Sequence, residues 1–220
     1  MKIGVLGTGS AGEAIASALI RKGHQVMLGS RTANNEKGKA WVEKFGENAM
    51  QGRFDDAAGF GEIFFISLHG EHTLNVVRSL SETKVRNKIV VDITNPLDFS
   101  KGMPPRIIEG LGNSTSLGEE IQKLIPSAHV VKTLNTINYK LMVDARIVNN
   151  GDHNIFISGN SADAKNRVKD LLVNNFYWRA DCIIDLGGIE TARTVEEMVP
   201  FWVSIWQKMG NPLYNFKIVR

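Results

Sequence analysis

Residues 1–31 read MKIGVLGTGSAGEAIASALIRKGHQVMLGSR, and this stretch decides the predicted fold. The segment 2–6 is short and apolar, as expected of a buried strand, and Gly7-Thr8-Gly9-Ser10-Ala11-Gly12 has the spacing G-x-G-x-x-G. Residues 11–22 then place small and aliphatic side chains on one stripe, which predicts an amphipathic helix. A strand, a glycine-rich turn and a helix in this order are typical of a dinucleotide-binding unit.

Each glycine of this loop has a predicted task. Gly7 permits the tight turn, Gly9 lets the backbone approach a pyrophosphate, and Gly12 brings the helix close to the strand. The first turn of the helix supplies free N–H groups and partial positive charge. The alternative interpretation is a tight turn that binds no ligand. The candidate phosphate-binding residues are Gly7, Thr8, Gly9, Ser10, Ala11 and Gly12.

The end of the second predicted strand, 25–28, indicates which dinucleotide binds. Proteins that bind NAD usually carry an acidic residue about 20 positions after the loop, where it holds the ribose hydroxyls. This chain instead has Gly29-Ser30-Arg31-Thr32, with a guanidinium that can bind phosphate and with Lys37 nearby. The sequence therefore predicts NADPH over NADH, with a solvated basic loop as the alternative. The candidate residues are Ser30, Arg31, Thr32 and Lys37.

Short apolar strands alternate with helical patterns along the rest of the chain. The predicted fold class is therefore α/β: a Rossmann-type, doubly wound, mainly parallel sheet with a short C-terminal helical and strand appendage. At 220 residues we expect one domain, with 1–185 as the sheet-and-helix core and 186–220 as the appendage. Further strands are expected at 49–51, 63–68, 88–93, 129–134, 154–158 and 182–185, and further helices at 116–126 and 162–175.

The C-terminal segment has its own pattern. Apolar positions from about residue 190 to residue 209 follow helical spacing, and Pro200 is expected to kink this helix. Two tryptophans and a phenylalanine between residues 201 and 206 exceed what one face of a surface helix needs. They are either core residues or part of an aromatic-rich dimer interface. Residues 213–219 are expected to add a final strand.

Composition excludes several classes of protein. The net charge of +3 comes from dispersed Lys and Arg, so no nucleic-acid partner is expected. Cys182 is the single cysteine, which excludes a disulfide framework and a thiolate zinc site and favours a buried, inert thiol. No metal site is expected. Because no apolar run approaches the roughly 20 residues of a membrane span and the start of the chain does not resemble a signal peptide, we expect a cytoplasmic protein without a membrane partner.

Three loops that follow predicted strands are expected to shape a pocket for a redox acceptor, because ligands of open α/β sheets bind at the carboxyl ends of the strands. These loops are Ser67-Leu68-His69, Asn95-Pro96-Leu97 and Asn135-Thr136-Ile137. His69 and His72 flank a turn and are candidates to line the pocket or to bond a phosphate or a carbonyl, with a structural or solvent role as the alternative for His69. The Gly- and Pro-rich stretch 96–114 is either a lid or a plain connection.

The chain resembles the coenzyme F420-dependent NADP oxidoreductase family. The resemblance spans nearly the whole chain, and the segments that carry it are Gly7–Gly12, Gly29-Ser30-Arg31, Glu71-His72, Lys88-Ile89-Val90-Val91, Val130-Val131, Thr136-Ile137, the C-terminal helix and Lys217-Ile218-Val219. The middle of the chain is also similar to the cytosolic reductase domain of six-transmembrane ferric reductases, through Asp92-Ile93-Thr94-Asn95-Pro96 and Val130-Val131-Lys132.

The resemblance implies hydride transfer between NADP(H) and a deazaflavin such as coenzyme F420, with FMN and FAD as the alternative acceptors. A homodimer is expected because a second subunit could complete the acceptor cleft of a chain without a large substrate domain. No catalytic side chain is expected, because the cofactors carry this chemistry. His72 matches a histidine of the resembling families. Asn135 is a departure, since members that use the deazaflavin can carry histidine there, and this leaves the acceptor open. The alternatives are a non-catalytic NADPH sensor and an NADPH reductase for another small substrate.

Overall fold

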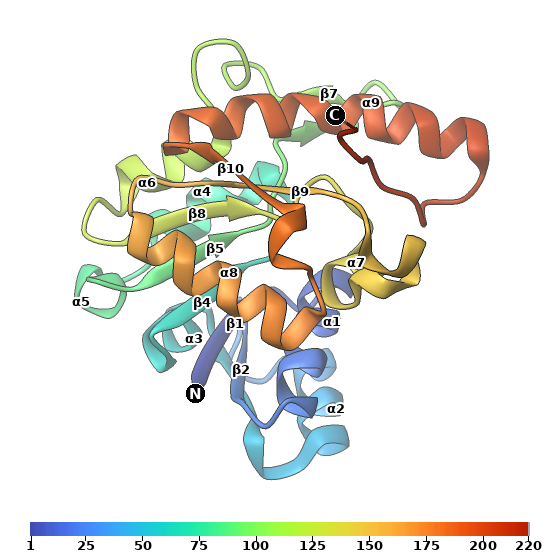
Figure 1. The fold of residues 1–220 in the computed structure, drawn as a ribbon. Helices are drawn as coiled ribbons and strands as arrows, with labels where there is room; N and C mark the ends of the chain where they lie inside the picture. Colours follow the sequence, from blue (N-terminus) through green and yellow to red (C-terminus); the bar gives the residue numbers. More distant parts are fainter. Residues whose placement is uncertain (220) are drawn as a thin grey trace.

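The computed structural model describes residues 1–219 and arranges the main strands in one eight-stranded sheet (Figure 1). Across the sheet the order is β10-β9-β8-β5-β4-β1-β2-β3. The strands are β1 (Lys2–Leu6), β2 (Gln25–Ser30), β3 (Ala49–Arg53), β4 (Ile63–Ile66), β5 (Ile89–Asp92), β8 (His129–Thr133), β9 (Ile155–Ser158) and β10 (Ile183–Gly187).

The pairing of these strands confirms the predicted fold class. From β3 to β8 every neighbouring pair is parallel, whereas β9 is antiparallel to β8 and β10 is parallel to β9. The chain winds outward from β1 to β2 and β3, then returns to place β4 on the other side of β1. The switch point of this doubly wound sheet therefore lies between β1 and β4, and in such sheets ligands bind at the carboxyl ends of the strands beside this point.

Helices cover both faces of the sheet because its strands are apolar on both sides. Ile3 and Val5 pack into one core together with residues of α1 (Ser10–Arg21), α2 (Glu36–Phe45), α7 (Tyr139–Val143) and α8 (Ala162–Phe176). Leu6 and Phe64 face the opposite core, which is built with α3 (Phe54–Phe60), α4 (Gly70–Arg78), α5 (Glu82–Val85) and α6 (Leu117–Leu124). This alternation is the two-residue period of a strand buried on both faces.

Two further elements lie at the carboxyl edge of the sheet. The long helix α9 (Ala192–Met209) crosses this edge, drawn in red in Figure 1, and runs without a break through Pro200. A small antiparallel hairpin of β6 (Leu97–Asp98) and β7 (Arg106–Ile107) lies beside it, within the stretch expected to be a lid or a connection. Short 3₁₀ turns occupy Gly46–Asn48, Ala145–Ile147, Asn149–Gly151, Ala180–Cys182 and Ile189–Thr191.

Some sequence expectations were wrong in detail. The strand expected at 129–134 ends at Thr133, because Leu134 takes a left-handed conformation with φ of 60°. The strand expected at 63–68 ends at Ile66, so that Ser67 already belongs to the loop. No strand forms between 213 and 219. The tail lies against Asn154, whose backbone N–H donates to the Phe216 carbonyl at 2.9 Å. Residues 213–219 do not pair with a strand of the sheet. In the described part of the chain, no helix is long and apolar enough to cross a membrane.

Candidate functional site

The glycine loop lies at the switch point, between the end of β1 and the start of α1. Gly7 has φ of +127°, and a Cβ placed on it would lie 2.2 Å from the Ser67 carbonyl oxygen. A Cβ on Gly12 would lie 2.1 Å from the Gly7 carbonyl oxygen. Both positions therefore require glycine so that the loop, α1 and β4 can pack closely. The Gly12 contact is the close approach predicted from the sequence, and the positive φ of Gly7 agrees with the predicted tight turn.

Gly9 differs from its neighbours because no protein atom lies within 4 Å of the position a Cβ would take. It precedes the first turn of α1, and no side chain of the described residues caps that turn. The first intrahelical bond runs from the Glu13 N–H to the Gly9 carbonyl, so the preceding N–H groups have no helical partner. A bare backbone at a helix N-terminus suits a phosphate group. The loop therefore fits the pyrophosphate of a dinucleotide.

The basic residues predicted to select the nucleotide follow β2. Arg31 and Thr32 are exposed, whereas Ser30 is buried and its hydroxyl donates to the Thr32 carbonyl at 2.6 Å. Ser30 therefore shapes the turn that presents Arg31. Lys37 is exposed in the first turn of α2, which Asn35 caps by accepting from the Gly38 N–H at 3.1 Å.

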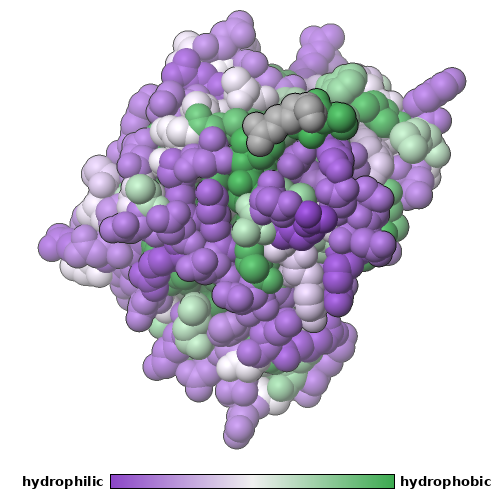
Figure 2. Space-filling view, viewed as in Figure 1, coloured by the Kyte–Doolittle hydropathy of each residue, from purple (hydrophilic) through white to green (hydrophobic). Residues whose placement is uncertain are grey.

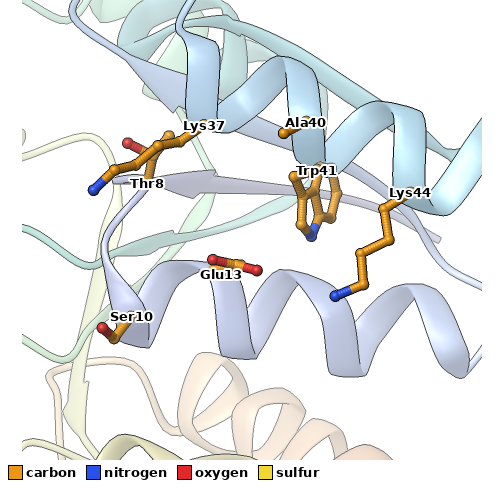
Figure 3. A pocket seen from close by; sticks show the side chains of 7 residues that line it. All are labelled: Thr8, Ser10, Glu13, Lys37, Ala40, Trp41 and Lys44. Atoms are coloured by element: carbon orange, nitrogen blue, oxygen red, sulfur yellow. The ribbon is translucent and has the colours of Figure 1, made fainter.

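A cavity of about 330 Å³ separates α1 from α2 next to the glycine loop (Figure 3). Figure 3 shows Lys37, Trp41 and Lys44 of α2 above α1. The Trp41 indole N–H donates to Ser17 Oγ at 3.0 Å and holds the two helices together. Of these three residues the sequence predicted Lys37 only. Trp41 and Lys44 were missed, although they follow Lys37 at helical spacing, which could have indicated them. The lining residues are Thr8, Ser10, Glu13, Lys37, Ala40, Trp41 and Lys44.

The first predicted acceptor loop joins β4 to α4. The Ser67 N–H donates to the Leu6 carbonyl at 2.9 Å, which places this loop beside the glycine loop. His69 precedes α4, and its carbonyl accepts from Thr73 Oγ1 at 3.0 Å. His69 and His72 are both exposed, and His72 lies 3.4 Å from the Glu71 carboxylate at the surface.

The other two acceptor loops contact each other through a pair of asparagines. Asn95 Nδ2 donates to the Asn135 carbonyl at 2.7 Å, and Asn135 Nδ2 donates to Asn95 Oδ1 at 2.9 Å. Asn135 Nδ2 also donates to the Val195 carbonyl of α9 at 3.1 Å. Pro96, Thr136 and Ile137 are buried, and Leu97 begins β6. The structure thus brings both loops together at the carboxyl edge and adds α9, which the sequence did not assign to the site.

A buried ion network of Asp92, Lys132 and Glu196 lies at the same edge of the sheet. Lys132 Nζ is 2.9 Å from Asp92 Oδ2 and 2.7 Å from Glu196 Oε1, and it donates to the Thr94 carbonyl at 2.6 Å. Burial by itself lowers the pKa of Lys132, but the two carboxylates outweigh it and the pKa lies above its ordinary value. In the sequence this network is indicated only by a charged residue that follows an apolar run in each of two strands, Asp92 after 89–91 and Lys132 after 130–131.

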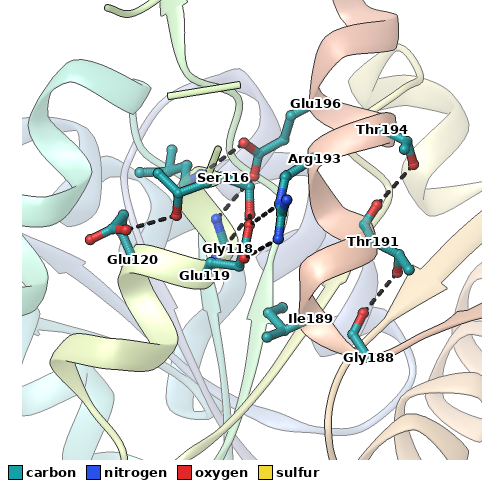
Figure 4. A network of polar contacts seen from close by, with 12 residues as sticks. Ser116, Gly118, Glu119, Glu120, Gly188, Ile189, Thr191, Arg193, Thr194 and Glu196 are labelled. Carbon is teal, nitrogen blue, oxygen red and sulfur yellow. Dashed lines mark hydrogen bonds and ion pairs between the residues drawn. The ribbon is translucent and has the colours of Figure 1, made fainter. Parts of the chain in front are cut away.

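The start of α6 completes this network (Figure 4). The Glu196 carboxylate accepts the Leu117 N–H at 2.8 Å and the Gly118 N–H at 3.0 Å, so a carboxylate of α9 satisfies the N-terminus of α6. Ser116 also caps α6 by accepting from the Glu119 N–H at 3.0 Å, and this confirms the predicted helix start. Among residues 1–219, no group of three or more His, Cys, Asp or Glu side chains is arranged to hold a metal ion. Cys182 is buried as predicted, and burial raises the pKa of its thiol.

Comparison with known proteins gives consistent matches. The family model described as NADP oxidoreductase, coenzyme F420-dependent, matches residues 2–96. The F420-dependent NADP reductase of Methanocaldococcus jannaschii is 30% identical over 216 residues, which cover 93% of this chain and 92% of that protein. A crystal structure from Arthrobacter sp. FB24, provisionally described as an F420-dependent NADP-reductase, is 40% identical, covers all of both chains and has a TM-score of 0.91. The rat metalloreductase STEAP3 is 27% identical over 91% of this chain, which spans 38% of that protein.

Proposed function

The chain belongs to the family of coenzyme F420-dependent NADP oxidoreductases, and from this we propose that it transfers hydride between NADPH and a deazaflavin. The observation that carries the proposal is the bare backbone at Gly9 in front of the uncapped first turn of α1. The open space at Gly9 leaves room for a phosphate group in front of the helix N-terminus. When bound, NADPH supplies the hydride, and the deazaflavin accepts it together with one proton from solvent.

The nucleotide half of the proposed site extends from β1 to β3. The N–H groups at the start of α1 bind the pyrophosphate, and Gly9 allows its close approach. Arg31 and Lys37 bind the 2′-phosphate with Thr8 and Thr32 beside them, while Ser30 holds the turn. No acidic residue lies between 29 and 35 to repel that phosphate, which supports NADPH over NADH.

The acceptor half lies over the ends of β4, β5 and β8. Ser67, Leu68 and His69 flank the nicotinamide, and Asn95–Leu97 together with Asn135–Ile137 form the floor on which a flat ring can stack. Asn135 is held by Asn95 and by Val195, so its role here is to join the loops. The relatives that match over 92% of their own length are F420-dependent NADP reductases, which favours a deazaflavin acceptor. FMN and FAD are therefore tested only for comparison.

The test is anaerobic oxidation of NADPH by the purified protein with coenzyme F420, FMN, FAD or a ferric chelate. Turnover with coenzyme F420 that is faster with NADPH than with NADH supports the proposal. Turnover only with a flavin or a ferric chelate would show that this compound, and not the deazaflavin, is the acceptor. Tight NADPH binding without turnover on any of the four would contradict an enzyme of this class and favour the sensor.

We also propose that the chain is one domain and assembles as a homodimer through α9 and the C-terminal tail. Arg193 forms a bidentate pair with Glu119, and the buried Glu196 carboxylate accepts the Leu117 N–H. Both contacts hold α9 against the core. The outer side of this region stays apolar: the exposed fractions of Phe201, Met209 and Ile218 are 59%, 60% and 54%. Figure 2 shows hydrophobic residues in green gathered near the end of the tail in the upper part of the view. Large exposed apolar side chains on one helix and the tail that follows it favour association.

A further inference from the structure

The Lys132 ammonium is fully buried, and each of its three hydrogens has an oxygen partner, from Asp92, Thr94 and Glu196. The network carries two negative charges for one positive charge. Backbone N–H groups of α6 compensate Glu196, and Thr94 donates to Asp92 through its N–H at 2.9 Å and its hydroxyl at 2.6 Å. No charge in the network therefore lacks a partner.

Stability alone does not account for such a network. Removing charges from water is costly, and well-packed apolar residues at similar positions are often as stable or more so. What the ion network supplies is a fixed geometry, because each bond has a defined length and direction.

The network joins three segments that border the proposed acceptor site. Thr94 immediately precedes the loop 95–97, Lys132 lies at the end of β8 just before the loop 135–137, and Glu196 belongs to α9. The bonds of Asn135 to Asn95 and Val195 join the same three segments a second time. None of these bonds reaches β1, β2 or β3, which carry the nucleotide half.

We propose that Lys132 is a positioning residue for the redox acceptor: with Asp92 and Glu196 it fixes α9 against the loops 95–97 and 135–137, on which the acceptor stacks. The inference rests on the proposed function, since it places the acceptor at these loops. Lys132 itself does not touch the acceptor, because it has no exposed surface. Its effect is on the position of α9 and of the two loops that support the acceptor, and a displacement of about 1 Å can lower a rate roughly a hundredfold.

The main test uses a charge-free network, Asp92→Asn with Lys132→Met and Glu196→Gln, so that no single buried charge is left without a partner. We expect cooperative unfolding to be retained and the Kd for NADPH to stay within about twofold. We expect kcat/KM for coenzyme F420 to fall by about 10- to 100-fold, and the Kd of coenzyme F420, followed by its fluorescence, to rise. If the triple variant does not fold, Thr94→Val removes only the hydroxyl bond to Asp92, and the expectation is a smaller change with the same selectivity.

Lys88→Met is the matched control. Lys88 Nζ also has three oxygen partners, the carbonyls of Ala58, Gly59 and Gly61 at 3.0, 2.7 and 2.6 Å, but it lies at the opposite end of β5. We expect this variant to lose stability while the kinetics with coenzyme F420 stay unchanged.

Wild-type acceptor kinetics in a folded network variant would overturn the inference, as would an equal loss of NADPH and acceptor binding. The fluorescence titration separates this failure from failure of the proposed function. A wild-type protein that binds coenzyme F420 without turnover contradicts the proposed function only, and the variants then decide the inference by binding. A wild-type protein that does not bind coenzyme F420 overturns both.

Discussion

Arg193 of α9 holds Glu119 of α6 in a bidentate pair, with Nε donating to Oε2 at 2.8 Å and Nη2 donating to Oε1 at 2.9 Å (Figure 4). Burial raises the pKa of Glu119, but the hydrogen bonds from Arg193 and Ser116 outweigh it, and the pKa lies below its ordinary value of 4.5. The pair fixes the start of α9 independently of the buried ion network.

The depressed pKa of Glu119 predicts a pH-dependent contribution to stability. Because the folded pKa is the lower one, the contribution is fully present above pH 4.5 and is lost as the pH falls through the folded pKa. Glu119→Gln should lower the Tm at pH 7 by roughly 2–4 °C. Thermal unfolding of both proteins from pH 7 to pH 3 checks this, and a difference in Tm that does not shrink in acid would contradict it.

Substitutions in the glycine loop should separate binding from folding. Gly9→Val places its side chain in the space left for the phosphate, so it should abolish NADPH binding while the Tm and the circular dichroism stay near wild type. Gly12→Ala should instead lower the stability, because its Cβ would overlap the Gly7 carbonyl oxygen. Calorimetric titration with NADPH and thermal unfolding measure the two effects. Retained affinity in Gly9→Val would mean that the nucleotide binds elsewhere.

Arg31→Ala should weaken NADPH binding far more than NADH binding. A charged hydrogen bond to phosphate is worth about 1.5–3 kcal/mol, which corresponds to roughly 10- to 100-fold in Kd. Lys37→Ala should have the same selectivity with a smaller effect, because an ammonium lacks the planar fork of a guanidinium. The Kd values come from fluorescence titration, with Arg167→Ala as a surface control on α8. Equal losses for the two nucleotides would disprove the role of Arg31.

The proposed dimer predicts that charge on the outer side of α9 separates the subunits. Phe201→Glu combined with Met209→Glu should convert a dimer of the wild-type protein to a monomer, with the fold retained because both side chains are exposed. Light scattering after size-exclusion chromatography gives the mass, and Ile147→Glu, at an exposed apolar residue elsewhere, is the control. A monomeric wild-type protein would rule out the dimer.

The sequence predicted the first half of the fold well because its signals are local. A strand, a G-x-G-x-x-G turn and an amphipathic helix follow each other within residues 2–21, and each is defined by backbone geometry over a few residues. The alternation of apolar strands and helices then required a parallel sheet, and a parallel sheet brings the ends of β4, β5 and β8 to one edge. This topology is why the acceptor loops were predicted without any knowledge of their contacts.

The tertiary structure alone decided what encloses that edge. Periodicity predicted α9 as a helix but gave no indication that Glu196 reaches Leu117, 79 positions earlier, or that Lys132 meets Asp92 across 40 positions. The same holds for Asn135, which sequence comparison marked as a departure and the structure shows as a bridge to Val195. Residue types along a chain fix local conformation through the backbone, whereas contacts over such separations depend on how the layers pack and where each loop ends. The sequence thus determined where the nucleotide loop forms, and the packing of α9 on the sheet decided which residues face the acceptor loops.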